Sequence, residues 1–207
     1  MWIKSIQSLL SNAVNPDSVE IVTRIDDDDP QAGKYMSSTT GTQMRVFIVG
    51  QCLGYSGVGV YYDECARVAT GDVLLTWNDD MFSETPGWDV LYEKAMTGKV
   101  VVGTAQVSSP AEGRRNHYRF AGPAISRGLY EKLGSISFNG NGSFDRCYDA
   151  LCRHAKCEVQ IPVDVNHLHV TIPNPERDAF YGECVANWGT KSEQWERMGM
   201  EAAEKLR

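Results

Sequence analysis

The stretch ATGDVLLTWNDDMF, residues 69–82, decides how this sequence folds and where its chemistry lies. A run of β-forming residues from Val73 to Thr76 follows a Gly-Asp turn, which predicts a buried strand. Trp77 and then two carboxylates, Asp79 and Asp80, come soon after the run. Because α/β proteins bind ligands at the carboxyl ends of such strands, these two acids are the first candidates for a functional site.

The segments around this strand alternate between strand and helix patterns. Apolar and β-branched runs predict further strands, and apolar residues at helical spacing predict helices. This order predicts an α/β fold with a mainly parallel sheet flanked by helices. No repeat, low-complexity tract or linker divides the chain, so we expect a single domain. The predicted strands cover 19–25, 43–50, 72–77, 99–107 and 158–172, and the predicted helices cover 2–13, 60–70, 87–98, 126–134, 140–155 and 191–207.

Composition narrows the function classes. The 207 residues are 42% hydrophobic and carry a formal net charge of −7. An acidic chain disfavours nucleic acid as a partner and suits recruitment of divalent cations to carboxylates. No apolar run approaches the roughly 18 residues that span a bilayer, so we expect no membrane span and a cytoplasmic protein.

The cysteines and glycines exclude several familiar sites. The six cysteines are expected to be reduced thiols, and the spacing of Cys147, Cys152 and Cys157 does not match a zinc site. The acidic run from Asp26 to Asp29 lacks the glycine and glutamate of a calcium loop. The glycines of GYSGVG, residues 54–59, match neither a phosphate loop nor a dinucleotide fingerprint.

The joint order of the motifs resembles glycosyltransferase family 2, whose members have a GT-A fold. The order is a strand, an acidic turn, a second strand, a glycine-rich loop, a helix, and an A-x-G-D strand that ends in acids. The resemblance implies transfer of a sugar from a nucleotide-sugar donor to an acceptor hydroxyl, with inversion and with Mn²⁺ or Mg²⁺. It covers roughly residues 3–181 and rests on VTRIDDDDP, ARVATGDVLLTWNDDMF, PGWD, FAGPAISRGLYEKLG, SFDRCYDALCRHA and DVNHLH.

The resemblance also implies a metal site. Asp80 matches the last acid of the family's D-x-D motif, and Asn78 replaces the first acid, which leaves Asp79 or water to supply other contacts. His167 and His169 lie two apart on a predicted strand and point to one face, so either is a candidate ligand. A packed or exposed pair of histidines is the alternative.

The catalytic base implied by the resemblance is Asp145, with Asp149, one helical turn later, as the fallback. A carboxylate that only stabilises the start of the helix is the alternative for Asp145.

Substrate recognition is assigned to other polar and aromatic positions. Asp26, Asp28, Asp63 and Asp79 are candidates for binding the donor nucleotide. Trp88 is a candidate for stacking on an acceptor sugar, with core packing as the alternative. Arg114, Arg115 and Arg119 form either a lid over the diphosphate or a solvated loop.

One departure from the family concerns the sheet. Family members begin with a strand ahead of the helix that matches residues 2–13, and this sequence has none, so we expect the sheet to lack its first strand. Residues 1–107 are expected to form the nucleotide-sugar and metal half, 108–181 the acceptor and catalytic half, and 190–207 a C-terminal helix. The alternative functions are a non-catalytic or truncated carbohydrate-binding scaffold and a nucleotidyltransferase.

Overall fold

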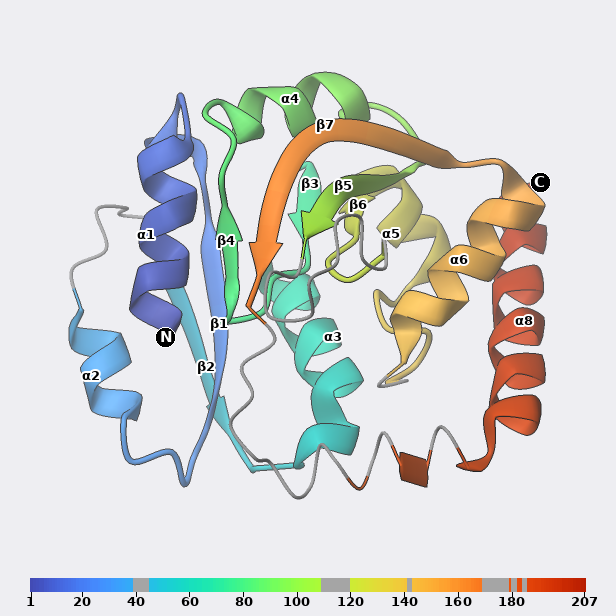
Figure 1. Ribbon diagram of the computed structural model, residues 1–207, viewed down its shortest axis with the longest axis horizontal. Helices are drawn as coiled ribbons and strands as arrows, with labels where there is room; N and C mark the ends of the chain where they lie inside the picture. Colours follow the sequence, from blue (N-terminus) through green and yellow to red (C-terminus); the bar gives the residue numbers. More distant parts are fainter. Residues whose placement is uncertain (39–44, 109–119, 141–142, 169–178, 180–181, 184–185) are drawn as a thin grey trace.

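The structure, a computed structural model, describes residues 1–38, 45–108, 120–140, 143–168, 179, 182–183 and 186–207 (Figure 1). Helices and strands alternate along it, with two short 3₁₀ turns, as the α/β class predicts. The helices are α1 (Trp2–Asn12), α2 (Ala32–Ser37), α3 (Val58–Val68), α4 (Trp88–Met96), α5 (Arg127–Leu133), α6 (Phe144–Ala155) and α8 (Trp188–Glu204). The strands are β1 (Ile21–Asp26), β2 (Arg45–Gly50), β3 (Val73–Leu75), β4 (Met81–Ser83), β5 (Val102–Ser108), β6 (Ala124–Ser126) and β7 (Glu158–His167).

The strands form two sheets. β1 and β2 make a parallel pair, and the other strands make a five-stranded sheet in the order β3-β6-β5-β7-β4. Within that sheet only the β5–β7 pair is parallel among the pairings of the described residues, and β3–β6, β5–β6 and β4–β7 are antiparallel. The α/β class is therefore confirmed, whereas the expected mainly parallel sheet is wrong. The cause is the two short return strands β4 and β6, which run against their neighbours.

Helix α1 fixes the turn that carries the acids. Its apolar stripe of Ile6, Leu9 and Leu10 is buried in the core that also contains Met81. On the same helix the Ser5 hydroxyl donates a 2.7 Å hydrogen bond to the Met81 carbonyl and accepts one of 2.8 Å from the Trp77 indole. These two bonds tie both ends of the turn after β3 to one buried side chain.

A second core lies on the other side of the five-stranded sheet. Tyr148 and Leu151 of α6 are fully buried there, together with Ala202 and Ala203 of α8. Helix α8 runs alongside α6 at the edge of the molecule in Figure 1. One face of α6 is therefore packed against α8. The first turn of α6, which carries Asp145, lines the same cleft as Asp79 and Asp80.

In the part of the chain that the structure describes, the two sheets are not joined to each other, and β1 of one sheet and β3 of the other border the space between them. In Figure 1, β1 and β2 descend on one side and β3 descends on the other, so all three run in the same direction. Within the described part of the chain, β1 pairs with β2 alone and β3 pairs with β6 alone. The expected first strand is accordingly not found between them among the described residues, and a cleft of about 1780 Å³ lies there.

Candidate functional site

The cleft brings together most of the acids singled out in the sequence. We call the end of the cleft at the carboxyl ends of β1 and β3 the acidic mouth, and its side chains are Asp26, Asn78, Asp79, Asp80, Asp145 and His167. They come from four separate parts of the chain: the end of β1, the turn after β3, the start of α6 and the end of β7.

Asp80 and His167 meet because β4 pairs with β7. The register places Met81 opposite His167, and the Leu168 N–H donates a 3.0 Å hydrogen bond to the Asp80 carbonyl. As a result His167 Nε2 lies 3.1 Å from Asp80 Oδ1, with side-chain exposures of 8% and 19% respectively. Two of the three side chains that the sequence predicted as metal ligands, Asp80 and His167, are therefore neighbours at the wall of the cleft.

The geometry of this pair fits a hard divalent ion. Two adjacent ligands of an octahedral ion, each about 2.1 Å from the metal, are about 3 Å apart. The Nε2 to Oδ1 separation is 3.1 Å, and one carboxylate oxygen with one imidazole nitrogen is a donor set that suits Mn²⁺. His169, the other predicted ligand, lies outside the described residues.

Asn78 and Asp79 lie in the same turn after β3 but have different surroundings. The Asn78 side-chain oxygen accepts a 2.5 Å hydrogen bond from the Tyr62 hydroxyl, which holds that amide toward α3. The pKa of Asp79 is raised by loss of water and by the neighbouring Asp80 charge, against the opposing charge of the Met1 ammonium. The surroundings of Asp79 thus disfavour its charged form, as is common for groups at ligand-binding sites.

Asp145 lies in the first turn of α6 and lines the same cleft. Phe144, beside it, packs edge-on against Tyr62 with ring centroids 5.2 Å apart, which links this helix to the turn after β3. Desolvation raises the pKa of Asp145 to about 6, although the Arg146 charge and backbone N–H groups oppose the shift. A carboxylate with this pKa can take up and release a proton near neutral pH.

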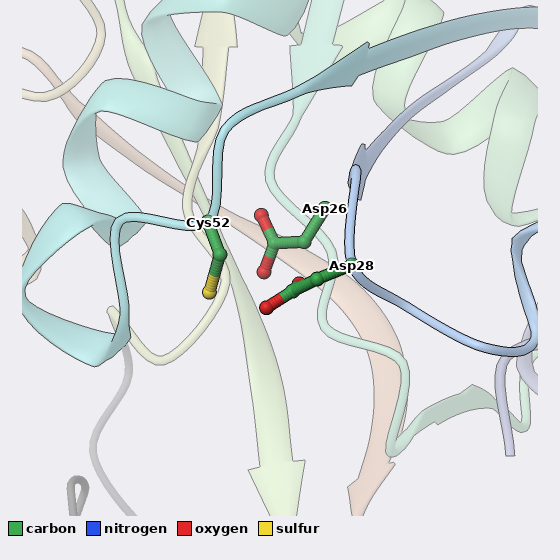
Figure 2. A group of neighbouring side chains, drawn as sticks. All are labelled: Asp26, Asp28 and Cys52. Atoms are coloured by element: carbon green, nitrogen blue, oxygen red, sulfur yellow. The ribbon is translucent and has the colours of Figure 1, made fainter.

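Asp26, Asp28 and Cys52 form a second cluster at the carboxyl end of β1. Their ligand atoms all lie within 4.8 Å of one another, and Figure 2 shows the three side chains converging from the end of β1, the turn that follows it and the loop after β2. The Arg24 guanidinium lies 3.1 Å from Asp26 Oδ1 and already neutralises that acid. Asp28 and Cys52 are exposed, and exposed acidic groups commonly lie close together without an ion, so we assign no metal here.

Arg24 is a site residue that the sequence reading missed. Its side chain is 5% exposed, with Glu64 of α3 at 2.7 Å and the Gln51 carbonyl at 2.7 Å. These contacts set the position of the acidic turn relative to α3 and the loop after β2. A single arginine inside a strand pattern carries no signal that would have predicted this role.

Asp63 was predicted to bind the donor, but the structure gives its carboxylate other partners. Oδ1 accepts hydrogen bonds from the N–H groups of Ile136 and Ser137 at 2.7 and 3.1 Å. The hydroxyls of Ser135 and Ser137 also donate to this carboxylate. Asp63 does not line the cleft and instead holds the loop after α5, so it is left out of the proposed site.

We expect Asp63→Ala to destabilise the protein. The substitution leaves buried donors of Ser135, Ile136 and Ser137 without their acceptor, which costs about 1–3 kcal/mol. Glu131→Ala, at an exposed position of α5, is the matched control, with an effect within about 0.5 kcal/mol. Urea unfolding of the two variants measures both values, and equal small effects would contradict the anchoring role.

Two further predicted site residues are placed less favourably. Trp88 is 8% exposed, and its indole N–H donates a 2.8 Å hydrogen bond to the Leu9 carbonyl. It packs in the core, as the alternative interpretation had it, and the geometry does not favour stacking on an acceptor. Asp149, the fallback base, lies off the cleft and pairs with Arg153 at 3.4 Å. Arg114, Arg115 and Arg119 lie outside the described residues.

Comparisons with known proteins add no family assignment. A scan against protein-family models found no match, and a search of curated proteins found none either. Among the described residues, the structure contains no helix with the length and apolar character needed to cross a bilayer.

Proposed function

We propose that this protein is a cytoplasmic, metal-dependent, inverting glycosyltransferase that moves a sugar from a nucleotide-sugar donor to an acceptor hydroxyl. The observation that carries the proposal is the Asp80–His167 pair, 3.1 Å apart at the wall of a cleft that Asp79 and Asp145 also line. A candidate metal-ligand pair and a carboxylate of raised pKa in one cleft are the groups that such a transfer requires.

Asp80 and His167 are the residues that would hold Mn²⁺ or Mg²⁺ in this proposal. When bound, the ion supplies charge neutralisation at the donor diphosphate as the sugar leaves. Asp79 lies beside this pair and accepts hydrogen bonds from the donor. Asp26 and Asp28, at the carboxyl end of β1, accept hydrogen bonds from the ribose or base.

Asp145 is the general base in this proposal. It takes the proton of the acceptor hydroxyl as that oxygen attacks the sugar. Its desolvated position disfavours the charged form, and this keeps the pKa near 6. Above that pH the carboxylate is ionised and able to accept a proton, and Asp145 has this capacity before any substrate binds.

A melting screen with sugar nucleotides tests the proposal. The unmodified protein is heated with each of several uridine, guanosine and cytidine diphosphate or monophosphate sugars, with and without Mn²⁺. A donor at about 100 times its Kd should stabilise the fold by roughly 2.7 kcal/mol, and only when Mn²⁺ is present. If no sugar nucleotide shifts the melting temperature with Mn²⁺, the proposed function is wrong.

A pH dependence follows from the raised pKa of Asp145. With the donor found in the screen, the wild-type rate should fall as pH drops through about 6, because the base becomes protonated. Asp145→Asn should lower the rate by about 10²–10⁴-fold and remove this pH step. A variant that keeps the wild-type rate and profile would contradict the assignment of the base.

The raised pKa of Asp145 also predicts how stability depends on pH. Ionisation of Asp145, which activity needs, lowers the stability of the fold. The folded-state pKa, about 6, lies above the ordinary value of 3.8, so the folded protein binds more protons between these values. Stability from protonated Asp145 is present below pH 3.8 and is lost as pH rises through about 6. At pH 8, Asp145→Asn should therefore melt above wild type, and at pH 3.5 the two should melt together.

A further inference from the structure

Two cysteine thiols lie side by side where α6 ends and β7 begins, and the proposed function does not use them. Cys152 Sγ and Cys157 Sγ are 3.9 Å apart, and both residues are buried in the second core. Both are free thiols, and neither lines the cleft. The two sulfurs are in hydrogen-bond contact, so they form one chemical unit and not two separate core side chains.

The turn between α6 and β7 holds the two sulfurs together. The N–H of Lys156, whose φ is +54°, donates a 3.0 Å hydrogen bond to the Cys152 carbonyl and ends the helix. The N–H of Val102, on β5, donates a 2.8 Å hydrogen bond to the Cys157 carbonyl. Because the backbone is hydrogen-bonded at both cysteines, the fold itself keeps the pair in contact.

The separation of the two sulfurs is short enough for a disulfide to form. A disulfide bond measures about 2.0 Å, so the sulfur atoms would have to approach each other by about 1.9 Å. Shared by the two side chains, this movement is about 1 Å each, which rotation about the two Cα–Cβ bonds can supply. The bond can therefore form within the native fold.

A metal site explains the pair less well than a disulfide does. Zinc, the common thiolate-bound ion, is held in proteins by three or four ligand atoms. In the described parts of the chain, neither cysteine belongs to a group of three or more candidate ligand atoms that lie within 4.8 Å of one another. A disulfide needs no third group.

The surroundings favour reaction at Cys157 first. A hydrogen bond from the Cys152 thiol lowers the pKa of Cys157, although burial opposes this shift, and the thiolate is the nucleophilic form of cysteine. Cys157 is 8% exposed and Cys152 is 4% exposed. Arg153, His154 and Lys156, which lie between them in the sequence, are exposed. The pair thus lies beneath a surface turn, where a small oxidant can reach it.

We propose that Cys152 and Cys157 are a reversible redox site, at which hydrogen peroxide oxidises the two thiols to an intramolecular disulfide. The Cys157 thiolate attacks a peroxide oxygen and becomes a sulfenic acid as the O–O bond breaks. The other oxygen leaves as hydroxide and takes up the proton that Cys157 released, which gives water.

The second step closes the disulfide. The Cys152 sulfur attacks the Cys157 sulfur, the S–O bond breaks, and a second water leaves with the Cys152 proton. Two electrons pass from the thiols to the peroxide, and an external thiol reverses the reaction by exchange. This inference is independent of the proposed function, since it involves none of the acids in the cleft.

The test exposes the unmodified, reduced protein to hydrogen peroxide for measured times. The remaining thiols are alkylated in denaturant, and the tryptic peptides are identified by mass spectrometry. Trypsin cleaves between the two cysteines, so a disulfide joins the peptide of residues 147–153 to the peptide that begins at Cys157. We expect this linked product, with fragment ions that place the bond at Cys152, and its disappearance with dithiothreitol.

Cys147 is the internal control, because it is a fully buried cysteine of the same helix. Cys157 should lose its free thiol at least about tenfold faster than Cys147. Equal rates for these two cysteines, or no linked product by the time the exposed Cys52 has reacted, would overturn the proposal. This measurement needs no variant, so it decides the matter even if a substitution prevents folding.

Two variants test the order of attack. In Cys152→Ala the oxidation should stop at the sulfenic acid of Cys157, which dimedone traps when denaturant is added. In Cys157→Ala we expect at least about tenfold less dimedone adduct, formed at Cys152. Equal amounts of adduct in the two variants would contradict the assignment of Cys157 as the sulfur that meets the peroxide.

Discussion

Asp80→Asn should abolish Mn²⁺-dependent binding of the donor nucleotide while the fold keeps most of its stability. Asp80 Oδ1 is one of the two atoms of the candidate ligand pair, 3.1 Å from His167 Nε2. An amide oxygen carries no net charge and is a far weaker ligand for a hard divalent ion than a carboxylate. We expect Mn²⁺ affinity to fall by at least about 100-fold, a difference of roughly 2.7 kcal/mol.

The stability of the fold should change far less than metal binding, because two effects of the substitution oppose each other. Asp79 and Asp80 are adjacent like charges, and the Asp80 charge helps to raise the pKa of Asp79. Removing one charge relieves this repulsion, although it weakens the contact with His167. Calorimetric titration of Mn²⁺ and thermal melting measure the two quantities separately.

Asp149→Asn is the matched control for charge, because Asp149 is an acid outside the cleft that pairs with Arg153 on the surface of α6. It should bind Mn²⁺ and nucleotide as wild type does. His167→Ala should resemble Asp80→Asn, since it removes the other atom of the pair. Wild-type metal affinity in both Asp80→Asn and His167→Ala would show that the ion, if any, binds elsewhere.

The long elements could be predicted from the sequence because their periodicity extends over many residues. The 11-residue helix α1 and the 10-residue strand β7 fall where the pattern placed them. β4 and β6 have 3 residues each, which is too short for alternation to register, and neither was predicted. Missing these two return strands is what made the sheet look mainly parallel.

The candidate site could be predicted only in part, for the same reason. The motifs pointed to Asp80 and His167, and the β4–β7 pairing that brings them together depends on a strand that the sequence did not reveal. Asp63 could not be recognised as a loop anchor, because its partners are backbone N–H groups more than 70 residues away. Side-chain roles that depend on distant backbone donors leave no local pattern.

Gly199→Leu should be among the most destabilising single substitutions in the chain. Gly199 lies in α8 where that helix meets α6. A Cβ atom added there would lie 2.3 Å from Ala150 Cβ, 2.7 Å from the Leu151 nitrogen and 2.8 Å from the Cys147 oxygen. Two of these three atoms are backbone and cannot rotate away, so α8 must move off α6.

The expected loss of folding free energy is larger than the gain from the higher helix propensity of leucine. Leucine is a better helix former than glycine by up to about 1 kcal/mol, so an unobstructed site would be stabilised. Overpacking a close helix contact costs about 1–3 kcal/mol, and displacing α8 also exposes Trp195, Ala202 and Ala203, which are buried. We expect a net loss of at least about 3 kcal/mol, or a fall in melting temperature of roughly 6–12 °C.

Gly189→Leu separates the two effects because it makes the same substitution in the same helix. A Cβ atom at Gly189 meets nothing within 4 Å, so this variant should keep or slightly exceed wild-type stability. Trp195 is 6% exposed, and only Gly199→Leu should expose it to water, so the total tryptophan emission should shift to longer wavelength in that variant and not in Gly189→Leu. The ion pairs of Glu196 with Arg153 and His154 lie at the partly exposed rim and are too weak to hold the helices together by themselves. Equal melting temperatures for the two variants would mean that the close approach of α8 to α6 at Gly199 does not stabilise the fold.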